Sequence, residues 1–189
     1  MGIPSFFKRV RVRPAHLEDL DDLTNLLVIS FHSRQSMMGW LSGLFKISLR
    51  EDLRHRLGAG YRYYRCLLAI VDGETDQNNM EILVGTAEVT VQTNEAGEKQ
   101  AYIANFAVHP AYRRQGIGTK LLQSCEEVSK EWGFDHISLH TLDSNQQAQQ
   151  LYRKRGYQVH RIEYRGWGWL WRSRSNKLFL KKFYPCQKI

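Results

Sequence analysis

The sequence is poor in cysteine and has no long apolar run, and each shortage excludes a class of protein. The three cysteines, Cys66, Cys125 and Cys186, are too few and too widely spaced for a disulfide framework or a metal cluster. We therefore expect reduced, mostly buried thiols and no metal. No apolar stretch approaches the ~20 residues that a membrane-spanning helix needs, and the first residues lack the order of a secretory signal. We expect a cytoplasmic protein without a membrane partner.

The chain has no internal repeat and no linker-like segment, and 189 residues are a suitable length for one domain with a sizeable core. Alternating or continuous apolar residues predict strands near 10–13, 66–71, 82–92, 102–108, 137–141, 157–164 and 178–183. Apolar residues at helical spacing predict helices near 17–27, 44–57, 117–132 and 148–155, with a loop or broken helix at 32–43. We predict a single α/β domain at 8–184, with short tails at 1–7 and 185–189. Its mixed, largely antiparallel sheet of about seven strands is flanked by helices.

The formal net charge of +8 is unevenly distributed along the chain. Many of the basic residues lie towards its end: Arg161, Arg165, Arg172, Arg174, Lys177, Lys181 and Lys182. Such a surface attracts a polyphosphate ligand, nucleic acid, an anionic membrane or an acidic protein. A solvated basic face without a partner explains the charge equally well. The chain has no recognised nucleic-acid-binding motif, so we expect no nucleic-acid partner.

The strongest local signal is the segment RRQGIG at 113–118, between a predicted strand and a predicted amphipathic helix. Free N–H groups at the start of a helix, together with the positive end of its dipole, attract phosphate. Glycine lets the main chain approach a ligand closely, and Arg113 and Arg114 add positive charge. A glycine-rich turn before a helix is often only a turn, so the segment by itself does not identify a ligand.

Two further motifs give this segment a context, FAVHP at 106–110 and NxxAxxLYxxxGY at 145–157. The three motifs, in this order, resemble the GCN5-related N-acetyltransferase family, with likeness to bacterial, plastid and N-terminal protein acetyltransferases. The resemblance implies one domain that uses acetyl-CoA as its cosubstrate and requires no metal.

The resemblance also implies roles for individual residues. Main-chain groups at 106–108 would align the pantetheine arm, amides at 114–119 would bind the pyrophosphate, and Asn145 would contact the cofactor. Tyr152 would direct its hydroxyl at the thioester sulfur, the alternative being a tyrosine that only packs on the core. The cofactor-binding residues implied in this way are Phe106, Ala107, Val108, Arg113, Arg114, Gln115, Gly116, Ile117, Gly118, Thr119, Asn145 and Tyr152.

Acetyl transfer requires a proton acceptor, because an alkylamine with a pKa near ~10 is mostly protonated at neutral pH. Direct attack needs no acyl-enzyme, so Cys125 is expected to be a core thiol. Tyr102 and His140 resemble the pair that extracts the proton, through ordered water, in the eukaryotic N-terminal acetyltransferase acting on methionine-hydrophobic N-termini. Glu88, in a middle strand where family members carry a carboxylate, is the competing base. Two satisfied core residues are the alternative interpretation of the Tyr–His pair.

The segment RGWGWLWR at 165–172 is unusually aromatic and basic for the hairpin that covers the acceptor groove in this family. Exposed aromatic side chains are typical of recognition surfaces, so Tyr164, Trp167 and Trp169 are predicted to contact the substrate. A loop packed on itself, or buried in a homodimer, is an equal alternative. Arg and Trp side chains also stack on nucleic-acid bases.

These residues and the resemblance predict an acetyl-CoA-dependent N-acetyltransferase that acts on a protein N-terminal amine, a lysine amine or both. The alternative enzyme acetylates a small amine, although the basic hairpin disfavours a polycation. The non-enzyme alternative is a module that senses acetyl-CoA, which the presence of Asn145 and Tyr152 disfavours.

Overall fold

Two helices and then three strands follow the first strand, and helices and strands alternate from Ile117 to Glu163. The computed structural model describes residues 10–32, 41–73, 80–94, 96–164 and 175–185. The strands are β1 (Val10–Pro14), β2 (Tyr64–Gly73), β3 (Met80–Thr93), β4 (Lys99–Val108), β5 (His136–Leu142), β6 (Gln158–Glu163) and β7 (Lys177–Phe183). The helices are α1 (Leu20–His32), α2 (Leu41–Gly58), α3 (Ile117–Glu131) and α4 (Gln146–Lys154), with short 3-10 turns at Leu17–Asp19 and Pro110–Tyr112. No helix in these ranges is long and apolar enough to cross a membrane.

Within the described residues, seven strands form one sheet in the order β1-β2-β3-β4-β5-β7-β6. Neighbouring strands are antiparallel, except that β4 and β5 run parallel. The predicted α/β class, with a mixed and largely antiparallel sheet, is therefore confirmed. Strand β6 pairs with β7 and not with β5, so β7 lies between β5 and β6.

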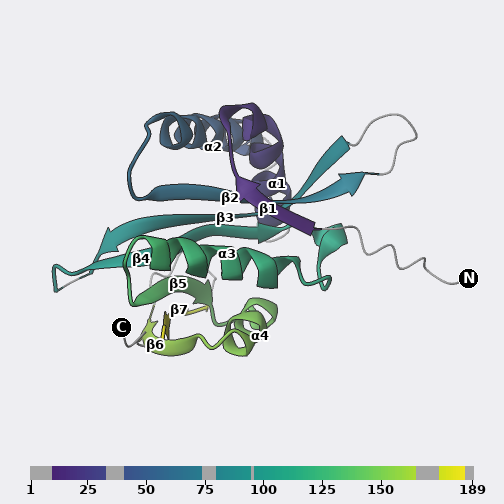
Figure 1. Cartoon of the computed structure of the whole chain (residues 1–189). Coiled ribbons are helices and arrows are strands. Elements are labelled where there is room, and N and C mark those ends of the chain that lie inside the picture. The colour runs from purple at the N-terminus through teal and green to yellow at the C-terminus, as the bar shows by residue number, and fades with distance from the viewer. Residues whose placement is uncertain (1–9, 33–40, 74–79, 95, 165–174, 186–189) are drawn as a thin grey trace, which may run out of the picture.

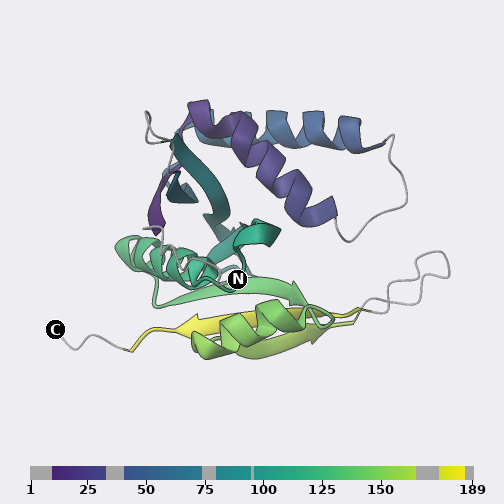
Figure 2. The same ribbon diagram turned by 90° about the vertical axis from the view of Figure 1, so that its right-hand side faces the viewer.

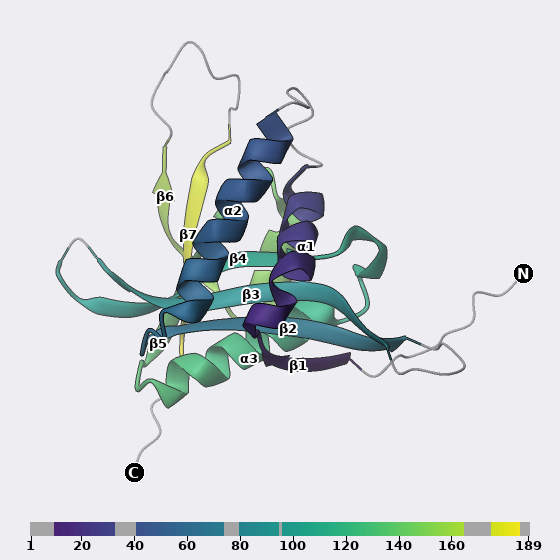
Figure 3. The ribbon, with the colours of Figure 1, turned by 90° about the horizontal axis from the view of Figure 1, so that it is seen from above.

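Helices cover both faces of the sheet. Helices α1 and α2 lie on one face and α3 on the other (Figure 1), and α1 and α2 lie side by side across β2, β3 and β4 (Figure 3). Helix α4 lies against the strands β5, β7 and β6 (Figure 2). Two buried clusters follow from these layers, one against α3 and α4 and one beneath α1 and α2.

Strand β2 illustrates how the sequence specifies both layers. Successive side chains of a strand point to opposite faces. Leu67, Ala69 and Val71 belong to the cluster against α3, whereas the residues between them belong to the cluster beneath α1 and α2. The continuous apolar run at 66–71 therefore reflects burial on both faces of the sheet.

Helix α2 begins earlier than the sequence predicts. It starts at Leu41 and not at 44, so the last part of the predicted loop at 32–43 is helical. Ser42 and Gly43 follow Leu41, and because both are weak helix formers the sequence pattern locates the start late. Helix α3 ends at Glu131, and Gly133 adopts a φ of +83°, which is usual for a glycine that terminates a helix.

The middle of the sheet opens beside Asn105. Strands β4 and β5 pair at Ala101, Tyr102 and Ile103, and within the described residues their pairing ends there. Asn105 has a φ of +46°, in the left-handed region, and the register of β3 and β4 shifts beside it. Such a bulge bends the strand. The carboxyl-terminal half of β4 is thereby released from β5 before the chain enters the turn that leads to α3.

A buried carboxylate fixes α3 relative to α4 and β7. Glu126 on α3 is 5% exposed, and its Oε2 accepts hydrogen bonds from Arg155 Nη2 and Lys182 Nζ, each at 2.7 Å. Arg155 follows α4 and Lys182 lies on β7. Removing one member of a buried charge network leaves the others without compensation, so such a network resists rearrangement. It holds together the two helices between which the candidate site lies.

Candidate active site

The turn between β4 and α3 presents free main-chain amides. Gly116, the N-cap of α3, has a φ of +79°, and Arg114 also adopts the left-handed region with a φ of +66°. These two conformations turn the chain so that it enters α3 at Ile117. The first N–H groups of a helix have no partner within the helix and lie at the positive end of its dipole. The turn therefore has the geometry of an anion-binding helix start, and binding of a pyrophosphate there stays a prediction.

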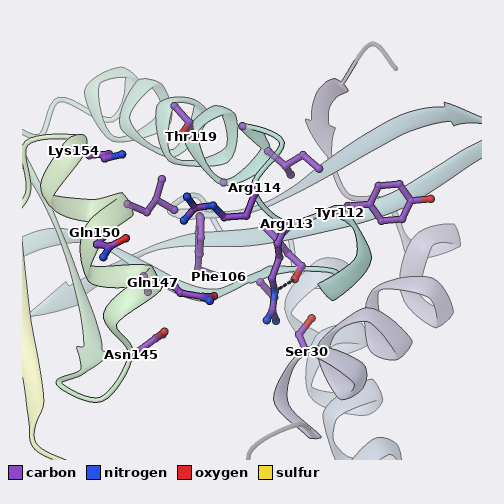
Figure 4. A pocket seen from close by; sticks show the side chains of 17 residues that line it. Ser30, Phe106, Tyr112, Arg113, Arg114, Thr119, Asn145, Gln147, Gln150 and Lys154 are labelled. Carbon is purple, nitrogen blue, oxygen red and sulfur yellow. Dashed lines mark hydrogen bonds between the residues drawn. The ribbon is translucent and has the colours of Figure 1, made fainter. Parts of the chain in front are cut away.

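A cavity of about 440 Å³ lies beside this turn, bounded by β4, the start of α3 and α4 (Figure 4). Ten residues predicted to bind the cofactor line it: Phe106, Ala107, Val108, Arg113, Arg114, Gly116, Ile117, Gly118, Thr119 and Asn145. Gln115 and Tyr152, which belong to the same prediction, are not among the lining residues. Gln115 is exposed on the turn, while Tyr152 is buried behind the cavity wall.

Seven further lining residues were not predicted to bind the cofactor. Two of them, Ala148 and Leu151, belong to the third motif, and the other five are Ser30, Tyr112, Gln147, Gln150 and Lys154. Three of these five lie on α4 at positions i, i+3 and i+7, which is the spacing of one helical face. That spacing, next to Ala148 and Leu151 of the third motif, was a signal that could have identified them. Ser30 comes from the end of α1, on the other face of the sheet, and no local pattern identifies such a contact.

The cavity suits a phosphate-bearing ligand. Figure 4 shows Arg113 and Arg114 extending from the turn, and Lys154 and Gln150 extending from α4 on the opposite side. Arg113 is fixed by a hydrogen bond from its Nε to the Val108 carbonyl oxygen, at 3.1 Å. Cations on both sides and amide donors at the helix start together favour a diphosphate group. The residues present therefore fit the pyrophosphate of acetyl-CoA.

Gly118 permits the close packing that forms one wall of the cavity. A Cβ atom at this position would lie 2.9 Å from Leu151 Cδ2 on α4 and 3.5 Å from the ring of Phe106. The shorter separation requires the leucine side chain to move. The second glycine of the predicted motif is thus explained by contact between α3, α4 and β4, and not by a positive φ.

Tyr152 lies behind Phe106. It is 4% exposed, and its ring centroid lies 5.9 Å from that of Phe106 and 5.9 Å from that of Tyr157. Burial raises the pKa of its hydroxyl, so the phenol remains protonated at neutral pH and can donate a hydrogen bond. The position suits a core tyrosine, and Tyr152 is not among the residues that line the cavity. Its catalytic role stays a prediction.

Tyr102 and His140 meet where β4 and β5 separate. The Tyr102 hydroxyl lies 2.9 Å from His140 Nδ1, and His140 follows Leu139, the last residue of β5 that pairs with β4. Burial raises the pKa of the Tyr102 hydroxyl. The predicted pair is therefore joined by a hydrogen bond between β5 and β4, the strand that leads to the cavity.

Glu163 on β6 is the neighbour of this pair that the sequence analysis missed. Its Oε1 lies 3.1 Å from His140 Nε2 and 2.9 Å from Arg161 Nη2. The hydrogen bond with His140, and next that with Arg161, lowers the pKa of the Glu163 carboxyl group. Only the strand order identifies this contact, because β7 lies between β5 and β6.

Glu88, the competing base, is buried in a different set of contacts. It is 1% exposed; its Oε1 accepts a hydrogen bond from Asn105 Nδ2 at 2.9 Å, and its Oε2 pairs with Arg56 of α2. Burial raises the pKa of the Glu88 carboxyl group, opposed by the Asn105 hydrogen bond and the Arg56 charge. Both oxygens are thus engaged in holding the β4 bulge to α2.

The predicted acceptor residues are only partly within the described structure. Tyr164 follows β6 and is 78% exposed. Trp167 and Trp169 lie outside the described residues, so the prediction that they contact the substrate stays a prediction. Cys66 and Cys125 are buried free thiols, and burial raises the pKa of each, which agrees with the expectation of core cysteines.

Comparisons with known proteins agree with this geometry. The model of the acetyltransferase (GNAT) family matches residues 27–157. Since this is more than half of the chain, the protein belongs to that family. A thialysine N-epsilon-acetyltransferase of Bos taurus is 30% identical over 118 residues, which cover 62% of this chain and 69% of the relative.

A further relative is the chloroplastic GCN5-related N-acetyltransferase 10 of Arabidopsis thaliana, 28% identical over 126 residues. The match covers 63% of this chain but 49% of the relative, so the chain spans about half of that protein's length.

Two solved structures share the fold. The PaiA N-acetyltransferase of Thermoplasma acidophilum, in complex with coenzyme A, has a TM-score of 0.69 at 19% identity, over 93% of this chain and 99% of the other. Arabidopsis thaliana NAA60, in complex with a bisubstrate analogue, has a TM-score of 0.65 at 18% identity, over 94% of this chain and 100% of the other. At these identities the likeness shows the fold alone.

Proposed function

We propose that the protein transfers the acetyl group of acetyl-CoA to a protein amine, either an N-terminal amine or a lysine amine, by direct attack. The observation that carries this proposal is the contact of the Tyr102 hydroxyl with His140 Nδ1, where β4 and β5 separate. It supplies a proton acceptor on the same strand that lines the cofactor cavity with Phe106, Ala107 and Val108.

The proton route follows from the donors and acceptors of the pair. A neutral imidazole with its hydrogen on Nε2, towards Glu163, leaves Nδ1 as an acceptor for the Tyr102 hydroxyl. The Tyr102 oxygen then accepts a proton from the acceptor amine, directly or through water, as its own proton moves to His140. The two N–H groups of the resulting imidazolium face the Tyr102 oxygen and the Glu163 carboxylate.

The charge of the described surface supports a protein acceptor over a polycation. The strands β6 and β7, next to the proton-accepting pair, carry Arg161, Lys177 and Lys181. Like charges repel, so this surface disfavours a polyamine and favours an acceptor whose neighbouring residues are neutral or acidic.

A small amine is the second candidate acceptor. The similarity to the Bos taurus thialysine N-epsilon-acetyltransferase favours it, because that relative is named for a small amino-acid substrate and is 30% identical to this chain. Thialysine resembles lysine in carrying one side-chain amine, so it avoids the repulsion that a polyamine experiences.

A panel of acceptors distinguishes the two candidates. Initial rates with acetyl-CoA are measured for a lysine-free peptide with a free N-terminus, an N-terminally blocked lysine peptide, thialysine and spermidine. We expect one of the two peptides to have a kcat/KM at least ~10-fold above either small amine, the scale of a single well-made contact. A blocked, lysine-free peptide is the control without an amine. A higher kcat/KM for thialysine than for both peptides would select the second candidate.

A further inference from the structure

The second ring nitrogen of His140 is held by a residue from a strand that does not pair with its own. His140 lies on β5, β5 pairs with β7, and Glu163 lies on β6 beyond β7. The two side chains therefore meet across the intervening strand β7, with 3.1 Å between Glu163 Oε1 and His140 Nε2. Both side chains are partly exposed, at 25% for His140 and 34% for Glu163.

The ring of Phe179, on the intervening strand β7, packs against the His140 imidazole and restricts its orientation. Phe179 on β7 is 6% exposed, and its ring centroid lies 4.8 Å from that of His140, with the planes tilted by 36°. Two further titratable groups pack against the Phe179 ring. Lys181 Nζ lies 5.5 Å from its centroid, and the His160 ring centroid lies 6.2 Å from it. Arg161 lies over the same ring at 5.7 Å and contacts Glu163.

The chemistry of a carboxylate determines where the imidazole hydrogen lies. A neutral imidazole carries one N–H, and an ionised carboxylate only accepts hydrogen bonds. The pKa of the Glu163 carboxyl group is lowered, so this group is ionised at neutral pH. The hydrogen bond that it accepts from His140 is fully present above the ordinary pKa of a glutamate, and it is lost only in acid, as the pH falls through the lowered pKa. Throughout the neutral range Nε2 therefore donates to Glu163, and Nδ1 faces Tyr102 as an acceptor.

We propose that Glu163 is a positioning residue that selects the Nε2–H tautomer of His140 and so keeps Nδ1 available to accept the Tyr102 proton. This inference rests on the proposed function, since it assigns proton removal to the Tyr102–His140 pair. Without Glu163 the hydrogen can lie on either ring nitrogen, and part of the enzyme presents an N–H to Tyr102 in place of an acceptor.

The first test requires no acceptor substrate. Imidazole ¹⁵N chemical shifts distinguish the two neutral tautomers, measured on the full chain at a pH well above ~6.5, where a histidine is neutral. We expect His140 in the Nε2–H form in the wild type and a mixture of tautomers in Glu163→Ala. The matched control is Glu131→Ala, which removes an exposed carboxylate that pairs with Arg65 at the end of α3. An unchanged His140 tautomer in Glu163→Ala would overturn the proposal.

The second test is a double-mutant cycle in kcat/KM. Glu163→Ala is expected to lower kcat/KM roughly 10-fold, a part of the 10²–10⁴-fold that general base catalysis contributes. Glu163→Ala combined with His140→Ala is expected to be no slower than His140→Ala alone, because Glu163 acts through that ring. Losses that multiply, with an unchanged tautomer, would show that Glu163 only stabilises the fold. If the wild type acetylates no peptide, the proposed acceptor is wrong, while the tautomer still decides the role of Glu163.

Discussion

Replacing Gly116 by aspartate is expected to weaken acetyl-CoA binding by roughly 100-fold, since like charges placed in contact cost several kcal/mol. Gly116 is the N-cap of α3 and lines the cavity, so a carboxylate there faces the site assigned to the pyrophosphate. A Cβ at this position meets no atom within 4 Å, so the substitution leaves the surrounding packing intact. Isothermal titration calorimetry with acetyl-CoA measures the change in Kd directly.

Gly116→Ala is the matched control for that experiment. Both variants place a side chain at a φ of +79°, and both therefore strain the turn, but only aspartate adds negative charge. We expect the alanine variant to lose no more than about 5-fold in affinity, the effect of roughly 1 kcal/mol of backbone strain. Equal losses in both variants would mean that the turn geometry, and not the charge facing the pyrophosphate, accounts for the weakened binding.

Replacing Tyr152 by phenylalanine is expected to lower kcat by about 100-fold while the Kd of acetyl-CoA stays within a factor of two or so, because general acid catalysis contributes at least about that much. The ring packs between Phe106 and Tyr157, and phenylalanine keeps that packing. Only the hydroxyl that is proposed to protonate the departing thiolate is lost. Single-turnover kinetics measure the chemical step apart from product release.

Tyr157→Phe provides the control, since it removes a hydroxyl from a neighbouring buried ring. The Tyr157 hydroxyl has no hydrogen-bond partner within the described structure, so its loss should leave both kcat and the thermal unfolding midpoint nearly unchanged. If Tyr152→Phe keeps the wild-type rate of the chemical step, Tyr152 has a packing role alone. A large fall in its unfolding midpoint would lead to the same conclusion.

Sequence reasoning succeeded where the deciding interactions are local. The amides that are predicted to bind the pyrophosphate belong to consecutive residues, and Gly116 and Gly118 lie at the start of α3 in the sequence as in the structure. The strands were identified because burial on one or both faces leaves an alternating or continuous apolar pattern, as at 66–71. The pairing of Tyr102 with His140 was predicted from resemblance, and their contact is now explained by the parallel pairing of β4 with β5.

The sequence could not indicate contacts that depend on the order of strands in space. Glu163 reaches His140 only because β7 is inserted between β5 and β6. Ser30 reaches the cavity only because the end of α1 approaches β4 from the other face of the sheet. The two bonds that engage Glu88 come from α2 and from the β4 bulge, and neither partner lies near it in the sequence.

The most direct test of the account compares kcat/KM for the best peptide acceptor in His140→Ala and in Glu88→Gln. We predict that His140→Ala loses roughly 100-fold, as expected for removal of a general base, and that Glu88→Gln stays within about 5-fold. Acetyl-CoA affinity and the thermal unfolding midpoint are measured in parallel. Values close to those of the wild type show that each variant is folded. An inactive but folded Glu88→Gln, beside an active His140→Ala, would contradict the account and assign proton removal to Glu88.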